Sequence, residues 1–221
     1  MNYYPNSGYR SWPQAASING VSVYYPAIYP YRSVPLQKIL CISKSEAQLN
    51  QVLRNLWEQH VAWTRMTIIS IVEGLADEKY VTARLLRNAP DMAAVFKKYY
   101  GERVAAKFNE LLTYHLVIAA ELVKAAKAGN QQAAANAEKR WYANADEIAE
   151  FLSSINPNWS KEEWTKMLHE HLKLTKDEAV YQLTGQYQQS IDTYDKIEKQ
   201  ALEMADVLTK GIVQQFPKMF N

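Results

Sequence analysis

The sequence predicts an all-α protein: an antiparallel four-helix bundle with short extra helices and an extended N-terminal tail. Apolar residues recur every three or four positions through residues 43–216, and no segment there alternates with the period of two typical of strands. By contrast, 5 of the 8 prolines and 7 of the 15 tyrosines lie in the first 42 residues. We therefore divide the chain into a Tyr/Pro-rich tail, residues 1–42, and a helical bundle domain, residues 43–221.

The tail is expected to be extended. Proline fixes φ and biases the residue before it away from helix, as in Tyr24-Tyr25-Pro26. The first acidic residue of the chain is Glu46. Tyrosines are amphipathic anchors, so residues 1–42 are suited to docking on a protein partner or on a second copy. A leader without contacts is an equally good interpretation, because chain termini are often unstructured.

The first long helix is expected over residues 43–74. Ser43-Lys-Ser-Glu46 is a capping box, in which the serine and glutamate side chains bind free backbone N–H groups at a helix start. Two shorter helical pieces, 78–88 and 91–100, are broken by Pro90. The second long helix covers 102–128, ahead of Gly129, and the third covers 131–155.

Two more capping boxes follow in the last third of the chain. Ser160-Lys-Glu-Glu163 opens a short helix that includes His171. Thr175-Lys-Asp-Glu178 opens the fourth long helix, about 40 residues to Phe216, which Gly185 kinks or interrupts. Its predicted inward face is Leu183, Tyr187, Ile191, Tyr194, Glu198, Ala201, Ala205, Leu208 and Ile212.

Three similar strings place histidines on the inward faces of three helices. They are Leu56-Trp-Glu-Gln-His60-Val, Leu111-Leu-Thr-Tyr-His115-Leu and Met167-Leu-His-Glu-His171-Leu. Neutral imidazole binds iron, zinc or copper, and helical bundles hold such ions with ligands from facing helices. The sequence therefore predicts a site for iron or zinc at His60, His115 and His171. The alternative is three core histidines whose nitrogens bond to neighbouring groups.

Carboxylates would complete such a site. Glu198 is the one most clearly on an inward face, while Glu121, Glu147 and Glu58 lie on flanks from which a long side chain could reach. Tyr194, one turn before Glu198, is a candidate hydrogen-bond donor to a ligand. Ferritin-like di-iron sites use Glu-x-x-His, and no glutamate stands three residues before any of the three histidines. A mononuclear or hemerythrin-like site is the more consistent form.

Several strings resemble an uncharacterised helical-bundle family of spore-forming Firmicutes. They are Leu56-Trp-Glu-Gln-His-Val-Ala-Trp-Thr-Arg65, Tyr99-Tyr-Gly-Glu102, His115-Leu-Val-Ile-Ala-Ala120, Trp141-Tyr-Ala-Asn-Ala-Asp-Glu-Ile148 and Ile155-Asn-Pro-Asn-Trp159. The resemblance covers residues 45–216 and leaves out the tail. The histidine pattern is also loosely similar to ferritin-like and hemerythrin-like bundles. These resemblances imply a helical bundle more firmly than a function.

Composition and motifs also limit which partners, locations and activities are expected. A net charge of +2 gives no reason to expect a nucleic acid partner. The only cysteine, Cys41, rules out an intramolecular disulfide framework, and the sequence has no signal peptide core and no apolar run that could cross a membrane. A cytoplasmic or spore-associated location is expected. No Gly-rich phosphate loop or Gly-x-Ser-x-Gly elbow occurs, so neither a nucleotide cofactor nor a kinase or hydrolase activity is predicted.

Two functions follow from these patterns. The first is a metal-binding bundle. The alternative is a non-catalytic structural or interaction protein, associated with the spore or envelope, that docks through residues 1–42.

Overall fold

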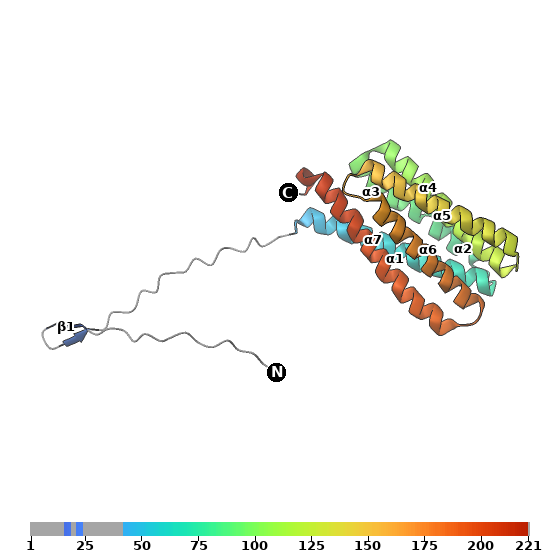
Figure 1. Cartoon of the computed structure of the whole chain (residues 1–221), viewed down its shortest axis with the longest axis horizontal. Coiled ribbons are helices and arrows are strands. Elements are labelled where there is room, and N and C mark those ends of the chain that lie inside the picture. Colours follow the sequence, from blue (N-terminus) through green and yellow to red (C-terminus); the bar gives the residue numbers. More distant parts are fainter. Residues whose placement is uncertain (1–15, 19–20, 24–41, 221) are drawn as a thin grey trace. The chain divides into compact units, whose positions relative to one another are not determined.

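Figure 1 shows the computed structural model of the protein, which describes residues 16–18, 21–23 and 42–220. The chain separates into two units, Met1–Cys41 and Ile42–Asn221, and each is described by itself. Residues 1–15, 19–20 and 24–41 of the tail lie outside the described residues. The docking role and the extended backbone expected of them therefore stay predictions.

Two short strands lie in the first unit. Strand β1 (Ala16–Ile18) pairs antiparallel with β2 (Val21–Val23), with Ala16 opposite Val23 and Ile18 opposite Val21. The expectation of an extended tail did not include this pairing. The sequence does carry a signal for it, because Asn-Gly, the dipeptide most favoured between hairpin strands, separates Ile18 from Val21-Ser-Val23.

The second unit is helical, which confirms the all-α class for residues 42–220. None of its helices is both long enough and apolar enough to cross a membrane. The elements are α1 (Lys44–Glu73), α2 (Glu78–Leu86), α3 (Asn88–Tyr100), α4 (Glu102–Lys127), α5 (Gln131–Ile155), α6 (Lys161–Leu183), α7 (Tyr187–Gln215) and a 3-10 turn (Pro217–Met219).

Two of the three predicted capping boxes begin helices. The Ser43 hydroxyl accepts the Glu46 backbone N–H at 3.1 Å before α1. The Ser160 hydroxyl accepts the Glu163 backbone N–H at 3.3 Å before α6. These bonds satisfy N–H groups that have no partner inside the helix, which is why serine at these positions marks a helix start.

The third predicted capping box is wrong, because Thr175 lies buried inside α6. The buried face of α6 continues past it from Leu172 to Ala179, so nothing interrupts the helix there. The helix ends instead near Gly185, whose φ of +71° lies in the left-handed region that favours glycine. The predicted 40-residue helix is thus divided between α6 and α7, giving five helices of 23 to 30 residues rather than four long helices.

Pro90 does not break a helix as predicted. It is the third residue of α3, which begins at Asn88, and Arg87 alone separates α3 from the end of α2 at Leu86. Proline is tolerated in the first turn of a helix, since the backbone N–H that it lacks would have no helical acceptor there.

Six helices form a closed ring rather than the predicted four-helix arrangement. Each of α1, α3, α4, α5, α6 and α7 packs against the next in this order, and α7 packs back against α1. Helix α1 also contacts α4 and α6, and α2 covers α1 and α4. The helices lie side by side in Figure 1. Their buried hydrophobic residues form one large core cluster and a smaller one of Ile68, Ile71, Val123 and Ala179.

The ring contains an internal threefold repeat. Helices α1, α4 and α6 carry His60, His115 and His171, and the next ring helix carries an amide 28 or 29 residues later. In each repeat the residue after the amide is an alanine, and a second alanine lies four residues after the first alanine. The amides are Asn88, Asn144 and Gln200, and the buried alanines are Ala89, Ala93, Ala145, Ala149, Ala201 and Ala205. The three similar histidine strings therefore mark three copies of one helical unit.

Candidate functional site

The three histidines lie in the wall of one small cavity of about 30 Å³. His60, His115 and His171 are each 3 or 4% exposed. The ring centres of His60 and His171 are 5.6 Å apart, and the Trp57 ring meets both of them edge-on. A cavity of this volume has room for about one or two water-sized groups.

Two of the histidines each form a hydrogen bond with an amide side chain from the next helix of the ring. In the second repeat, His115 Nδ1 lies 2.8 Å from Asn144 Oδ1, while Asn144 Nδ2 donates to the Leu111 carbonyl at 3.2 Å. In the third repeat, His171 Nδ1 lies 3.0 Å from Gln200 Oε1, and Gln200 Nε2 donates to the carbonyl of residue 167 at 2.7 Å. In both repeats the accepting carbonyl stands four residues before the histidine.

The first repeat departs from this pattern. Asn88 Nδ2 donates to the Leu56 carbonyl at 2.9 Å, again four residues before the histidine. However, His60 Nδ1 and Asn88 Oδ1, both buried, have no hydrogen-bond partner among the described residues. The two indole nitrogens of Trp57 and Trp164, which also line the small cavity, are likewise without a partner in this part of the chain.

The hydrogen bonds and burial fix the protonation of these rings. An amide oxygen can only accept, so the Nδ1–H of His115 and of His171 donates and Nε2 keeps the lone pair. For His115 that lone pair is used, because the Trp141 indole N–H donates to Nε2 at 3.1 Å. Burial lowers the pKa of His115 and of His171 to about 4 and lowers the pKa of His60 well below its usual value. All three rings are therefore neutral near pH 7.

The predicted carboxylate ligands lie elsewhere, and none lines the small cavity. Glu198 is on α7, where a hydrogen bond to Glu58 raises the pKa of Glu198. Glu121 is exposed and forms an ion pair with Arg140 at 2.6 Å, and Glu147 is exposed. Across residues 42–220, no three histidine, cysteine, aspartate or glutamate side chains are grouped so that they could hold a metal ion.

Tyr194 belongs to a different polar group. The Arg65 guanidinium lies 5.1 Å from the centre of its ring and donates to Glu178 Oε1 at 2.5 Å and to the Ser190 hydroxyl at 3.1 Å. Glu178 is 2% exposed, and burial raises its pKa to about 7 even though the Arg65 charge opposes the shift. The ion pair ties α1 to α6, and the hydrogen bond to Ser190 ties α1 to α7.

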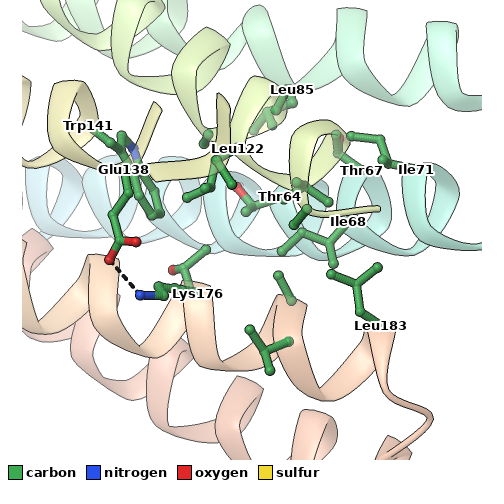
Figure 2. A pocket seen from close by; sticks show the side chains of 18 residues that line it. Thr64, Thr67, Ile68, Ile71, Leu85, Leu122, Glu138, Trp141, Lys176 and Leu183 are labelled. Carbon is green, nitrogen blue, oxygen red and sulfur yellow. Dashed lines mark hydrogen bonds and ion pairs between the residues drawn. The ribbon is translucent and has the colours of Figure 1, made fainter. Parts of the chain in front are cut away.

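A second, larger cavity of about 140 Å³ lies beyond the histidines (Figure 2). The C-terminal halves of α1, α4 and α6 all contribute to its wall, with Leu85 from α2 and three residues from α5. Most of the wall is apolar. It consists of Thr64, Thr67, Ile68, Ile71, Leu85, Ala119, Ala120, Leu122, Val123, Ala126, Ala134, Glu138, Trp141, Thr175, Lys176, Ala179, Val180 and Leu183.

The polar groups of this wall are few. Lys176 Nζ donates to Glu138 Oε1 at 2.5 Å, the ion pair marked by a dashed line in Figure 2. Three threonines supply hydroxyls: Thr64, Thr67 and Thr175. No sequence pattern pointed to these positions as a site, although the small residues among them interrupt an otherwise bulky buried face.

One tryptophan connects the two cavities. Trp141 lines the larger cavity, and its indole N–H donates to His115, which lines the smaller one. The amides Asn144 and Gln200 were not among the site residues predicted from the sequence, although their constant spacing from the histidines is visible there.

Comparison with known proteins gives no relative. No protein-family model, curated protein or solved structure matches the chain. The resemblance to a Firmicutes bundle family therefore stays a prediction, and the site has to be interpreted from its own geometry.

Proposed function

We propose that the protein binds a small, mostly apolar molecule in the larger cavity. The observation that carries the proposal is a partly open space of about 140 Å³ with an almost wholly apolar wall. Protein interiors are close-packed, and few contain voids much larger than a water molecule. A cavity of about 150 Å³ lined by apolar side chains is large enough to bind benzene or xenon. A molecule with one six-membered ring, or an aliphatic body of similar size, suits this space.

The position of the cavity supports the same proposal. Its wall is formed by the ring helices α1, α4, α5 and α6 together with α2, so a bound molecule would contact all three repeats of the domain. Lys176, Glu138 and Val180 are partly exposed, and the ligand would enter on their side of the wall. Apolar ligands gain mainly by leaving water, and the gain is roughly 25 cal/mol for each Å² of apolar surface buried.

Thermal unfolding with toluene tests the proposal. At a toluene concentration about ten times the dissociation constant, binding to the folded state adds about 1.4 kcal/mol of stability, or about 3–5 °C in Tm. Ala179→Leu places a larger side chain in the cavity wall and should remove this shift. Ala143→Leu, at an exposed position of α5, is the matched control and should keep it. A Tm unaffected by toluene in the wild-type protein contradicts the proposal.

A metal site at the smaller cavity is the second candidate. It is favoured by one arrangement: three neutral histidines line one cavity, and amide oxygens orient two of them through Nδ1. Such orienting bonds are typical of metal-binding histidines. Iron or zinc would require the three histidine rings to move closer together, because no three potential ligands of residues 42–220 are grouped to hold an ion. It would also require His115 Nε2 to exchange its Trp141 donor for the metal, with carboxylates supplied by groups other than the exposed Glu121 and Glu147.

Elemental analysis of protein purified without chelator tests this candidate. Stoichiometric iron or zinc that is lost in His171→Gln and retained in His169→Gln supports it. His169, on the same helix, bonds to Asp146 and lies away from the small cavity. Metal-free protein that takes up neither ion excludes it.

A further inference from the structure

Two buried hydroxyls interrupt the apolar wall of the larger cavity. Thr67 of α1 and Thr175 of α6 are 3% and 4% exposed, and neither Oγ1 has a hydrogen-bond partner in the described part of the chain. Thr64, in the same wall, differs because its hydroxyl donates to the His60 carbonyl at 2.7 Å. A buried hydroxyl without a partner destabilises the folded state, so two in one wall indicate a partner that enters the cavity.

The charged groups of the wall limit what that partner can be. Lys176 and Glu138 bind each other, so together they offer no net charge to an ionised ligand. An unpaired charge transferred into this apolar space would be strongly disfavoured. A threonine hydroxyl both donates and accepts hydrogen bonds, so a neutral group that does both matches it best. A second hydroxyl is such a group.

We propose that the ligand is a small apolar molecule that carries one hydroxyl, in the manner of a phenol or a short alcohol. Its hydroxyl pairs with Thr67 or Thr175, and its apolar body contacts the remaining wall. This inference rests on the proposed function, since it describes the ligand of the same cavity.

Calorimetric titration of toluene and phenol tests the inference with a pair of ligands of similar size. Phenol is the more strongly hydrated of the two, so a wholly apolar cavity binds it more weakly than toluene. In the wild-type protein we expect phenol to bind at least as tightly as toluene. Thr67→Val or Thr175→Val, which replaces a hydroxyl by a methyl group, should weaken phenol binding about tenfold and change toluene binding by less than about twofold. Thr64→Val is the control and should leave the ratio of the two affinities unchanged.

The outcomes separate the two proposals. Toluene binding together with phenol binding at least about tenfold weaker overturns the hydroxyl inference and leaves the apolar site intact. The same conclusion follows if neither valine substitution changes the phenol affinity. Absence of binding by both toluene and phenol overturns the proposed function and this inference together.

Discussion

Acidification should weaken the folded domain through its buried histidines. His115 and His171 have pKa values of about 4 in the folded protein, against about 6.5 for histidine in an unfolded chain. Below pH 6.5 the unfolded chain binds a proton at each position and the folded protein does not. The contribution of a histidine with a lowered pKa is therefore complete above pH 6.5 and is lost as the pH falls toward 4.

The size of the effect follows from the width of this window. Each pH unit between the two pKa values is worth about 1.4 kcal/mol, so each of the two histidines loses about 2 kcal/mol by about pH 5. His60, whose pKa is also lowered, acts in the same direction. Glu178 acts in the opposite direction: its pKa is raised to about 7, so its contribution grows as the pH falls and offsets about 2 kcal/mol of the loss between pH 7 and pH 5.

Because of this offset, the measurement compares variants instead of relying on the wild-type total. Urea unfolding followed by tryptophan fluorescence gives the free energy of unfolding at about pH 7 and about pH 5. In His115→Gln or His171→Gln, the fall between these pH values should be smaller than in the wild type by about 2 kcal/mol. Each variant is compared with itself, so a general loss of stability does not affect the difference. The partly exposed His169 supplies the control, His169→Gln. If both buried variants keep the wild-type pH dependence, the reasoning from burial is refuted.

Three further substitutions test a close side-chain contact, a buried ion pair and a backbone turn. Gly211→Ala should destabilise by about 2–4 kcal/mol, because the added Cβ would lie 1.9 Å from Trp159 Nε1; a Tm equal to that of the wild type would contradict this contact. Arg65→Met should cost about 3 kcal/mol near pH 7 by leaving Glu178 buried without its partner, and adding Glu178→Gln should recover much of it in a double-mutant cycle; additive losses would argue against coupling. Gly185→Ala should cost about 1–2 kcal/mol from backbone strain alone, since no atom lies within 4 Å of the added Cβ, and an unchanged urea midpoint would show that the positive φ is not required.

Local sequence signals predicted most of the helices. Capping serines and apolar periodicity depend on neighbouring residues, so the starts of α1 and α6 could be recognised from the sequence. For α7 the predicted inward face is correct in the C-terminal half, where Ala201, Ala205, Leu208 and Ile212 are buried, and wrong in the N-terminal half. Ile191 was expected inside and is 46% exposed, whereas Ser190 and Thr193 are buried. Ser190 is buried because it binds Arg65, a contact between residues 125 positions apart. Glu198, also expected on the inward face, is half-buried, while the residue before it, Ile197, is buried.

The candidate sites differ in how far the sequence reveals them. The histidines recur in three similar strings, and the structure places all three around one small cavity. Their amide partners follow a spacing that is visible in the sequence. The larger cavity has no such signal, because its volume depends on how 18 side chains from five helices fit together. A change of one methylene group in any of them alters that space.

A crystal structure of the protein equilibrated with toluene tests the central claim most directly. The account predicts electron density for one toluene molecule between α1, α4 and α6, in contact with Ile68, Leu122 and Ala179. Density only at the surface, or a cavity closed by its own side chains, would contradict it.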